Sequence, residues 1–305
     1  MSNKIIVVGS MNMDMVVKTS HIPQPGETVL GGSFLMNPGG KGANQAVAVA
    51  RLGGDVTFIG KIGDDIFGKQ SSQLFDEEGV DTNGILADDN SPSGIALITV
   101  DERGENSIVV APGANAHLEP NDVEEVLDNY PDSKILLVQL EIPMRTVEHA
   151  ARIARRRGMQ VILNPAPANS LVPSMFNLID IITPNVNEAE MLSGVRISDV
   201  PSARQAAESI HQQGVKHVIV TLGKDGAALL EEGIFYHIPT PSVETVDTTA
   251  AGDVFNGALA VAVSEGKALK DAVSFACRAA SIAVTRMGAQ SSIPFRNEVL
   301  LNSMT

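Results

Sequence analysis

The 305-residue sequence has a single cysteine, Cys277, and no tryptophan. One cysteine excludes an internal disulfide bond and any zinc site built from several thiolates. It is typical of a reducing compartment, so we expect a cytoplasmic protein. No apolar run approaches the roughly 18 residues that span a bilayer. The N-terminal MSNKIIVVGS has an apolar part too short for an export signal and indicates a buried first strand.

Basic residues are also scarce, because 22 lysines and arginines face 36 aspartates and glutamates, a formal net charge of −14. Nucleic acids and anionic membranes attract clustered cations, so neither is an expected partner. The one basic cluster, Arg155 to Arg157 before Gly158, is typical of the exposed end of a helix.

Several catalytic motifs are missing. The sequence has no GxxxxGK[ST] phosphate loop, no GxGxxG after its first strand, no HExxH pair and no GxSxG elbow. These absences disfavour P-loop nucleotide binding, Rossmann dinucleotide binding, zinc-protease chemistry and an esterase-type nucleophile. A function must therefore be sought in other patterns.

Short apolar runs alternate with helical patterns along the chain. Expected buried strands cover 5–9, 56–60, 134–140, 160–164, 180–183 and 217–223, and expected helices cover 42–54, 143–158, 202–214, 252–266 and 270–288. This alternation predicts a parallel sheet with helices on both faces. Residues 12–36 and 93–112 instead alternate polar and apolar, the second around DERGEN (101–106), and predict a small antiparallel flap within one continuous domain.

The stretch DTTAAGDVFNGAL (247–259) places small residues and Asp253 where a helix should begin. Backbone N–H groups at a helix N-terminus can bind a phosphate, and a carboxylate beside them could take a proton from an attacking hydroxyl. The alternative is structural: Asp253 would be a first-turn acid, and Ala250, Ala251 and Gly252 would only allow close packing. This stretch alone does not decide between them.

A second glycine-rich run, PGGKGANQA (38–46), precedes an alanine-rich helix. Lys41 and Asn44 supply donors suited to sugar hydroxyls, while a solvated lysine in a glycine-rich turn is the structural alternative.

Together the two runs resemble the paired signatures of the ribokinase-like carbohydrate kinase family. Further family motifs occur in the expected order over the whole chain: NMD (12–14), PGET (25–28), IGDD (62–65), QLE (139–141), NPAPA (164–168), TPNVNEAE (183–190), TLGKDG (221–226) and VTRMGAQ (284–290). The resemblance implies an α/β fold, a three-layer α/β/α sandwich with a central, mostly parallel sheet and a small β-sheet flap. It would form a single domain over 1–305, with lid strands from about 12–36 and 93–112.

The resemblance also assigns roles. Asp253 would be the general base, and the amides of Ala250, Ala251 and Gly252 would form the anion hole for the γ-phosphate. The sugar would contact Asn12, Met13, Asp14, Gly40, Lys41, Gly42, Ala43, Asn44, Glu141 and Asp253. ATP would lie near Asn185, Glu188, Thr221, Leu222, Gly223, Lys224, Asp225, Gly226, Gly252, Asp253 and Cys277. Cys277 stands where the family can place a histidine beside adenine, and its structural alternative is a small buried helix residue.

Two metal ions are implied as well. Mg²⁺ would accompany the ATP phosphates near Asn185 and Glu188, mostly through water. K⁺ would bind mainly through backbone carbonyls at Asp247, Thr249, Ala283, Arg286, Gly288 and Ser292. Exposed flap edges and the resemblance also imply a homodimer joined through the flap.

Within the family, GGKGANQA, QLE and NPAPA favour phosphorylation of D-ribose at its 5-hydroxyl by ATP. Deoxyribose, a ketose, a nucleoside or a sugar acid are alternative acceptors, although few aromatic residues are available to line a nucleobase site. A non-enzymatic sugar- or nucleotide-binding regulator is the third possibility, and the intact Asp253 disfavours it.

Overall fold

The computed structural model describes residues 3–301, and within them nine strands form a large sheet in the order β13-β12-β11-β10-β9-β8-β1-β4-β5. Pairing is parallel from β5 to β11 and antiparallel from β11 through β12 to β13. The strands are β1 (Ile5–Val8), β4 (Val56–Gly63), β5 (Asp81–Asp88), β8 (Ile135–Val138), β9 (Gln160–Leu163), β10 (Ile181–Ile182), β11 (His217–Thr221), β12 (Ala227–Glu231) and β13 (Ile234–Ile238).

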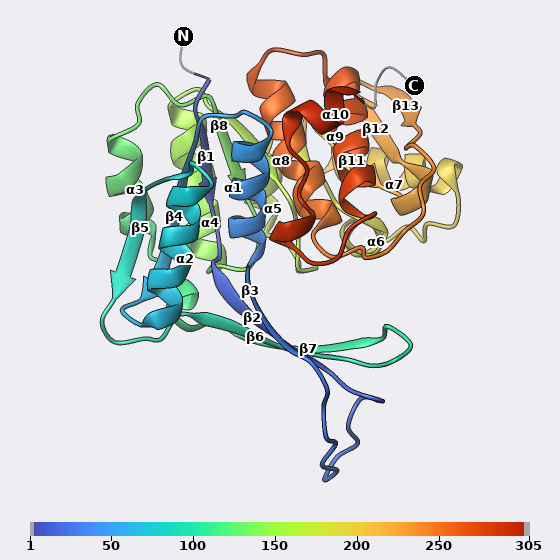
Figure 1. Ribbon diagram of the computed structural model, residues 1–305. Helices are drawn as coiled ribbons and strands as arrows, with labels where there is room; N and C mark the ends of the chain where they lie inside the picture. The colour runs from blue at the N-terminus through green and yellow to red at the C-terminus, as the bar shows by residue number, and fades with distance from the viewer. Residues whose placement is uncertain (1–2, 302–305) are drawn as a thin grey trace.

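Helices cover both faces of this sheet (Figure 1). Alternate residues of β1 divide between two cores: Ile5 and Val7 pack with α1, α8 and α9, while Ile6 and Val8 pack with α3, α4 and α7. The helices are α1 (Lys41–Arg51), α2 (Ile66–Glu77), α3 (Pro120–Asp128), α4 (Met144–Arg156), α5 (Pro173–Phe176), α6 (Val186–Ser193), α7 (Val200–Gln212), α8 (Ala251–Ser264), α9 (Leu269–Ala283) and α10 (Arg296–Leu301).

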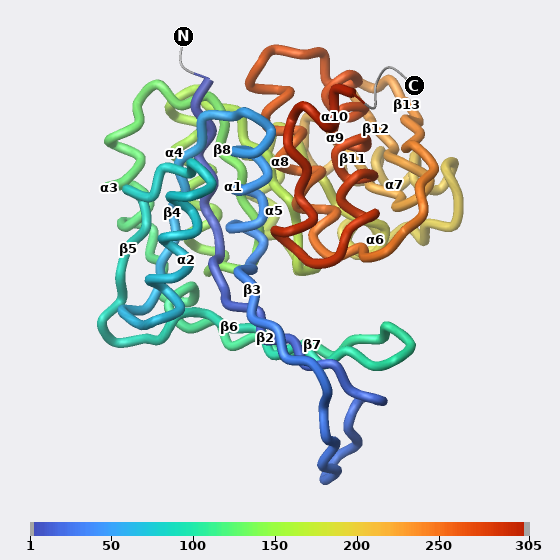
Figure 2. Tube along the Cα trace, in the orientation of Figure 1, coloured from blue at the N-terminus to red at the C-terminus, as the bar shows by residue number. Residues whose placement is uncertain are grey.

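A second sheet of four described strands projects from the three layers (Figure 1). Its order is β3-β2-β6-β7, formed by β2 (Asn12–Lys18), β3 (Phe34–Gly39), β6 (Gly94–Val100) and β7 (Asn106–Ala111). The pairs β2–β3 and β6–β7 are antiparallel, whereas β2 and β6 run parallel. The expected sandwich with a smaller second sheet is thus confirmed, although the second sheet is mixed and residues 19–33 contain no strand. Figure 2 shows those residues extending away from the sheet.

The carboxyl ends of β1, β8 and β9 meet the N-termini of α1 and α8 at one edge of the large sheet. Ligands of open α/β sheets bind at this edge. The helices α1 and α8 pack very closely, because a Cβ on Gly257 would lie 2.5 Å from the Cβ of Ala48. No helix among residues 3–301 is long and apolar enough to cross a membrane.

Candidate active site

Asp253 lies in the first turn of α8 and is only 6% exposed. Its Oδ2 accepts a hydrogen bond from Nδ2 of Asn44, and its Oδ1 accepts one from Nε2 of Gln45, each at 3.0 Å. Burial raises the pKa of Asp253, whereas Lys41 and the two amides partly oppose that rise. The structure therefore places a buried, hydrogen-bonded carboxylate at the start of a helix, where a proton acceptor has a defined orientation.

The backbone before Asp253 adopts an unusual turn. Ala250 has a φ of 61°, in the left-handed region that residues with a side chain seldom occupy. The first helical bond runs from the Val254 amide to the Ala250 carbonyl, so the preceding amides have no partner within the helix. A Cβ on Gly252 would meet no atom within 4 Å, which leaves this turn open to a ligand.

One amide of the expected anion hole is already engaged. The Ala251 N–H donates to the Thr248 carbonyl at 3.2 Å. Among residues 3–301, no protein acceptor pairs with the amides of Ala250, Gly252 or Asp253, so these amides and the helix macrodipole are available to an anion. Of the amides predicted to form the anion hole, only that of Ala251 is hydrogen-bonded to another backbone group in this turn.

Glu141, just after β8, holds the N-terminus of α1. Its Oε2 accepts from the hydroxyl of Ser10 at 2.5 Å and from the Lys41 amide at 2.9 Å. Its Oε1 lies 3.9 Å from Nζ of Lys41. One oxygen therefore fixes the helix end, as an N-cap side chain would, and the other remains beside the lysine for a ligand.

The glycines of the GGKG run serve close packing as well as access. A Cβ on Gly42 would lie 2.7 Å from the Gly9 backbone, and one on Gly39 would lie 2.2 Å from a carboxylate oxygen of Asp14. Gly40 has a φ of 91°, which suits glycine. These residues bring α1, the end of β1 and Asp14 together, so close packing is one reason for the glycines of this run.

Four carboxylates surround one lysine in this site. Burial, Glu141 and Asp253 raise the pKa of Asp14 to about 7 despite Lys41. Burial lowers the pKa of Lys41, but Asp253, Glu141, Glu188 and Asp14 outweigh it, so that the pKa rises overall. The site is thus strongly acidic around a fixed cation, a pattern that suits a polyhydroxylated neutral ligand.

The other predicted sugar ligands divide between the two faces of β2. Asn12 is oriented by Asn115, whose Nδ2 donates to its Oδ1 at 2.9 Å. Met13 points the other way and lines a hollow of about 240 Å³ with Met36, Pro38 and Leu74. Only the backbone of Met13 therefore shares a face with the site. Ala43 is buried, and its amide donates to the Ser10 carbonyl.

The pair Asn185 and Glu188 forms the capping box of α6. The Asn185 side chain accepts from the Glu188 amide, and the Glu188 carboxylate accepts from the Asn185 amide, each at 2.9 Å. Burial raises the pKa of Glu188, and Asp253 adds to this effect while Lys41 opposes it. The pair thus lies within electrostatic reach of the base and the lysine.

The predicted nucleotide residues lie beside this pair. Thr221 forms a bridge with Asn185, and the short helix η2 (Gly223–Asp225) follows, closed by the Leu222 amide donating to the Gly226 carbonyl. Lys224 and Asp225 are exposed on that turn. Cys277, on α9, is 4% exposed, and burial raises the pKa of its thiol to about 12.

The predicted K⁺ residues converge around Asp247. One of its oxygens accepts from the amide and hydroxyl of Thr249, and the other accepts from the Gly288 amide at 2.8 Å. Although burial raises its pKa, these hydrogen bonds lower it overall, so the carboxylate stays charged. Ala283 and Arg286 are joined by a backbone hydrogen bond, Arg286 also pairs with Glu298, and Ser292 lies in η3 (Gln290–Ser292) of the same region.

Sequence reasoning did not assign four side chains that orient the site: Ser10, Gln45, Asn115 and Asn164. Two of them stand in quoted motifs, Gln45 in PGGKGANQA and Asn164 in NPAPA. A polar residue inside an otherwise apolar helix pattern was the available signal for Gln45. Asn115 carried no such signal, because it lies in the short helix η1 (Gly113–His117) and acts 103 positions from Asn12.

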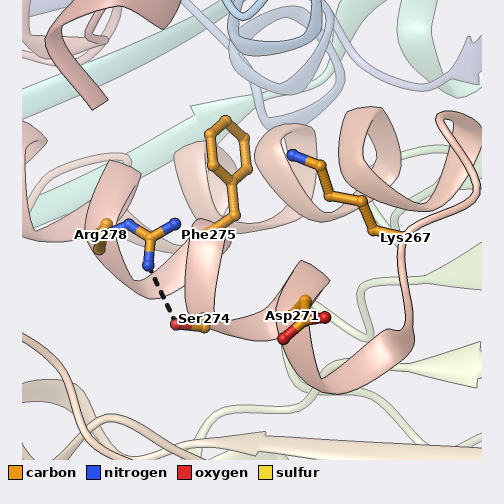
Figure 3. A pocket seen from close by; sticks show the side chains of 5 residues that line it. All are labelled: Lys267, Asp271, Ser274, Phe275 and Arg278. Atoms are coloured by element: carbon orange, nitrogen blue, oxygen red, sulfur yellow. Dashed lines mark hydrogen bonds between the residues drawn. The ribbon is translucent and has the colours of Figure 1, made fainter. Parts of the chain in front are cut away.

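A separate hollow of about 400 Å³ lies on α9, lined by Lys267, Asp271, Ser274, Phe275 and Arg278. Figure 3 shows the hydrogen bond that Arg278 donates to Ser274. None of these residues belongs to the site described above. The hollow has one helix and its preceding loop as walls, so we assign it no part in the chemistry.

Comparison with known proteins relates the whole chain to sugar kinases. The model of the pfkB family carbohydrate kinases matches residues 2–296. Ribokinase of Haemophilus influenzae is 46% identical over 98% of this chain and 98% of its own. The structure of Thermotoga maritima ribokinase has a TM-score of 0.90 at 43% identity, covering 99% of each chain. Arabidopsis thaliana ribokinase complexed with ribose and ATP has a TM-score of 0.91 at 34% identity, covering 99% of this chain and 98% of that one.

Proposed function

The chain belongs to the pfkB family of carbohydrate kinases, and on that premise we propose that it transfers the γ-phosphoryl group of ATP to the 5-hydroxyl of D-ribose. The observation that carries this proposal is the buried Asp253 carboxylate, held by Asn44 and Gln45 directly beside the open N-terminus of α8. It combines a proton acceptor with an anion site, which phosphoryl transfer requires in one place. The binding of ribose and ATP by the Arabidopsis relative supports the assignment.

In the proposed reaction, Asp253 accepts the proton of the 5-hydroxyl as that oxygen forms its bond to the γ-phosphorus. The bond between the γ-phosphorus and the β–γ bridging oxygen breaks, and ADP leaves. A carboxylate has about four acceptor positions, so the hydrogen bonds from Asn44 and Gln45 leave room for the hydroxyl. The amides of Gly252 and Asp253 face the charge on the transferred group.

The sugar would lie between β2 and α1. Asn12, Asp14, Lys41, Asn44 and the free oxygen of Glu141 supply both donors and acceptors. Among residues 3–301, Oδ1 of Asn44 is a buried atom without a hydrogen-bond partner, as expected of a group that accepts from a substrate hydroxyl. Gly40, Gly42 and the backbone of Met13 and Ala43 would shape the same wall. Similarity to the ribokinases of Haemophilus influenzae and Staphylococcus aureus, 46% and 39% identical to this chain, favours ribose over deoxyribose, a ketose or a sugar acid as the acceptor.

Nucleotide binding would use the surface between α6 and α9. Asn185 and Glu188 would face the phosphates, and Thr221, Leu222, Gly223, Lys224, Asp225 and Gly226 would border the nucleotide. Cys277 would lie beside the base.

Mg²⁺ would enter with ATP. The described residues contain no cluster of three or more His, Cys, Asp or Glu side chains arranged to hold a metal. The Glu188 carboxylate, already bonded to Asn185, fits a cation that keeps most of its water and binds the nucleotide phosphates. When bound, it would neutralise phosphate charge.

K⁺ would bind behind the anion site, near Asp247, Thr249, Ala283, Arg286, Gly288 and Ser292. The ionised Asp247 joins two loops there, one of which leads directly into Ala250. A cation at this position would order the turn that presents the Gly252 amide.

We also assign the second sheet the role of a lid of a single domain, closing over the sugar and excluding water. Its exposed apolar residues, among them Phe34, Leu97, Ile108 and Val109, support a homodimer joined through this sheet. The dependence on ATP and the single free thiol of Cys277 support a cytoplasmic location.

The direct test is an ADP-release assay with D-ribose, deoxyribose, fructose and a sugar acid, with ³¹P NMR to locate the new ester. We expect D-ribose to give the highest kcat/KM and a 5-phosphate product. ADP release that does not depend on any sugar, or a clear preference for another acceptor, would contradict the assignment.

A further inference from the structure

A buried chain of three side-chain amides runs behind Asp253. Gln139, just after β8, donates its Nε2 to Oε1 of Gln45 at 2.6 Å. Nε2 of Gln45 then donates to Oδ1 of Asp253 and to Oδ1 of Asn164, each at 3.0 Å. Gln45 and Gln139 are 0% exposed and Asn164 is 6% exposed, so no bulk water competes with these bonds.

The direction of this chain is fixed at its Asn164 end. Asn164 donates its own Nδ2 to the main-chain carbonyl of Thr183 at 3.3 Å, which leaves its Oδ1 facing Gln45. At the other end Gln139 donates its Nε2 to Gln45, while its own Oε1 is a buried atom without a hydrogen-bond partner among residues 3–301. The Gln45 oxygen therefore faces the Gln139 donor, and the Gln45 nitrogen faces the Asn164 and Asp253 acceptors. Exchanging the oxygen and nitrogen of the Gln45 amide would set its oxygen against the Asp253 carboxylate.

Gln45 differs in this respect from its neighbour Asn44. Both hydrogens of the Gln45 amide are used by Asn164 and Asp253, and its oxygen is used by Gln139. Asn44 keeps a buried Oδ1 without a partner among the described residues. Asn44 can therefore contact a substrate directly, whereas the polar atoms of Gln45 are all engaged within the protein.

We propose that Gln45 is a positioning residue, which fixes the rotation of the Asp253 carboxylate so that one edge faces the acceptor hydroxyl, and that Gln139 and Asn164 fix Gln45 in turn. The proposal rests on the proposed kinase function, in which Asp253 is the base. Rotation about the last bond of an aspartate is otherwise broad, so a second donor opposite Asn44 is needed to define it. A misdirected base loses rate even when substrate still binds.

The same hydrogen bond favours the ionised form of Asp253. Burial raises the pKa of that carboxyl, while Lys41 and the amides of Gln45 and Asn44 lower it, and Glu141 raises it further. Glu188 on α6 and Asp14 on β2 also face this cluster. Removal of the Gln45 donor should therefore move the pKa of Asp253 upward.

The test compares Gln45→Met, which keeps the side-chain volume but has no donor, with Gln45→Glu, which sets a second carboxylate against Asp253. We expect kcat of Gln45→Met to fall by about ten- to hundredfold, with the KM for D-ribose nearly unchanged. The acidic limb of its pH–rate profile should move to higher pH, and that of Gln45→Glu should move the same way. An unmoved limb together with wild-type kcat in Gln45→Met would overturn the proposal.

Two further measurements cover the remaining outcomes. Gln139→Met removes the hydrogen bond to Gln45 without touching Asp253. It should move the acidic limb of the pH–rate profile to higher pH, by less than Gln45→Met does. If Gln45→Met does not fold, Gln139→Met tests the positioning role in its place. Titration of the Asp253 carboxyl by ¹³C NMR in the ligand-free protein needs no turnover. If no sugar is phosphorylated, the proposed function fails, while an upward pKa in Gln45→Met still supports the positioning role and an unchanged pKa refutes it.

Discussion

Asn44 and Asp253 are 209 positions apart in the sequence, yet Nδ2 of the first lies 3.0 Å from Oδ2 of the second. The contact joins the first turns of α1 and α8, the two helices whose N-termini meet at the edge of the large sheet. The proposed base is therefore held in place by residues from opposite ends of the chain. Its orientation depends on the complete fold rather than on its local motif.

Replacement of Asp253 by asparagine should abolish most activity without unfolding the protein. Asparagine has the same shape but cannot accept the hydroxyl proton, so we expect kcat to fall by about 10²- to 10⁴-fold. Because burial raises the pKa of Asp253, the charged form is disfavoured there, and the Asp253→Asn protein should unfold at pH 8 at a temperature equal to or higher than that of the wild type. Steady-state kinetics and thermal unfolding measure the two effects, and near wild-type kcat would contradict the role of Asp253.

Asp14 should make the protein less stable as pH rises. Its pKa is about 7 in the folded protein against an ordinary value of 3.8, so the folded state binds the proton more tightly. The stability it contributes is complete below pH 3.8 and is lost as pH rises to about 7. Each pKa unit corresponds to about 1.4 kcal/mol.

We therefore expect Asp14→Asn to raise the free energy of unfolding at pH 8 and to change it little at pH 4. Urea unfolding at both pH values measures this difference. Asp132→Asn, at an exposed carboxylate, should show no such contrast. A gain for Asp14→Asn that is equal at both pH values would count against the raised pKa.

Glu141→Gln should weaken both sugar binding and the start of α1. The substitution removes the charge that faces the Ser10 hydroxyl and the Lys41 amide, so we expect a loss of about 1 kcal/mol of stability. The KM for D-ribose should rise by roughly tenfold, which corresponds to one lost hydrogen bond to a charged group. Glu119→Gln, at the N-cap of α3, should affect stability alone; an unchanged KM in Glu141→Gln would exclude the sugar contact.

The sequence patterns located best the strands that are continuous apolar runs and the helix whose apolar residues recur at helical spacing. The buried runs of β1, β4, β8 and β9, and the amphipathic α4, lie close to their expected positions. The patterns did not indicate α2, α3, β5 or the hairpin of β12 and β13. For β5 the reason is physical: only Gly84 is buried among its eight residues, so no apolar run marks it.

In the candidate site, too, some features could be predicted from the sequence and others could not. The resemblance to the carbohydrate kinases predicted a site at Asp253, Asn44 and Glu141, and the structure brings these three residues into one cluster. Spacing could not show that the Ala251 amide is paired with Thr248, nor that Met13 faces away from the site. Both facts depend on backbone rotation at single residues, which the sequence encodes only through the complete fold.

Replacement of K⁺ by a larger organic cation should lower kcat, because the Asp247 loop leads into the turn at Ala250. In Asp247→Ala we expect a lower rate that no longer responds to K⁺. Glu244→Ala, an exposed acid nearby in the same loop, should keep the full response. Activity assays over a K⁺ titration distinguish the two variants, and a normal K⁺ response in Asp247→Ala would refute the site.

The exposed apolar face of the second sheet gives a test of the dimer. Ile108 on β7 is 52% exposed, and a glutamate there should prevent burial against a second subunit. We expect Ile108→Glu to sediment as a monomer at micromolar concentration while the wild type sediments as a dimer. Ile234→Glu, at a position 57% exposed on β13, is the matched control and should leave the mass unchanged. A monomeric wild type would end the proposal.

The chain crosses from β1 to β2 through only Gly9, Ser10 and Met11. Asn12 and Asp14 thus belong to an inner strand of the projecting sheet while lying next to the edge of the large one. A tilt of that sheet would move both side chains, so a contact that stiffens the sheet would also fix the proposed sugar site. A contact on the outer surface of this sheet and the binding of a sugar beside Asn12 and Asp14 would therefore influence each other.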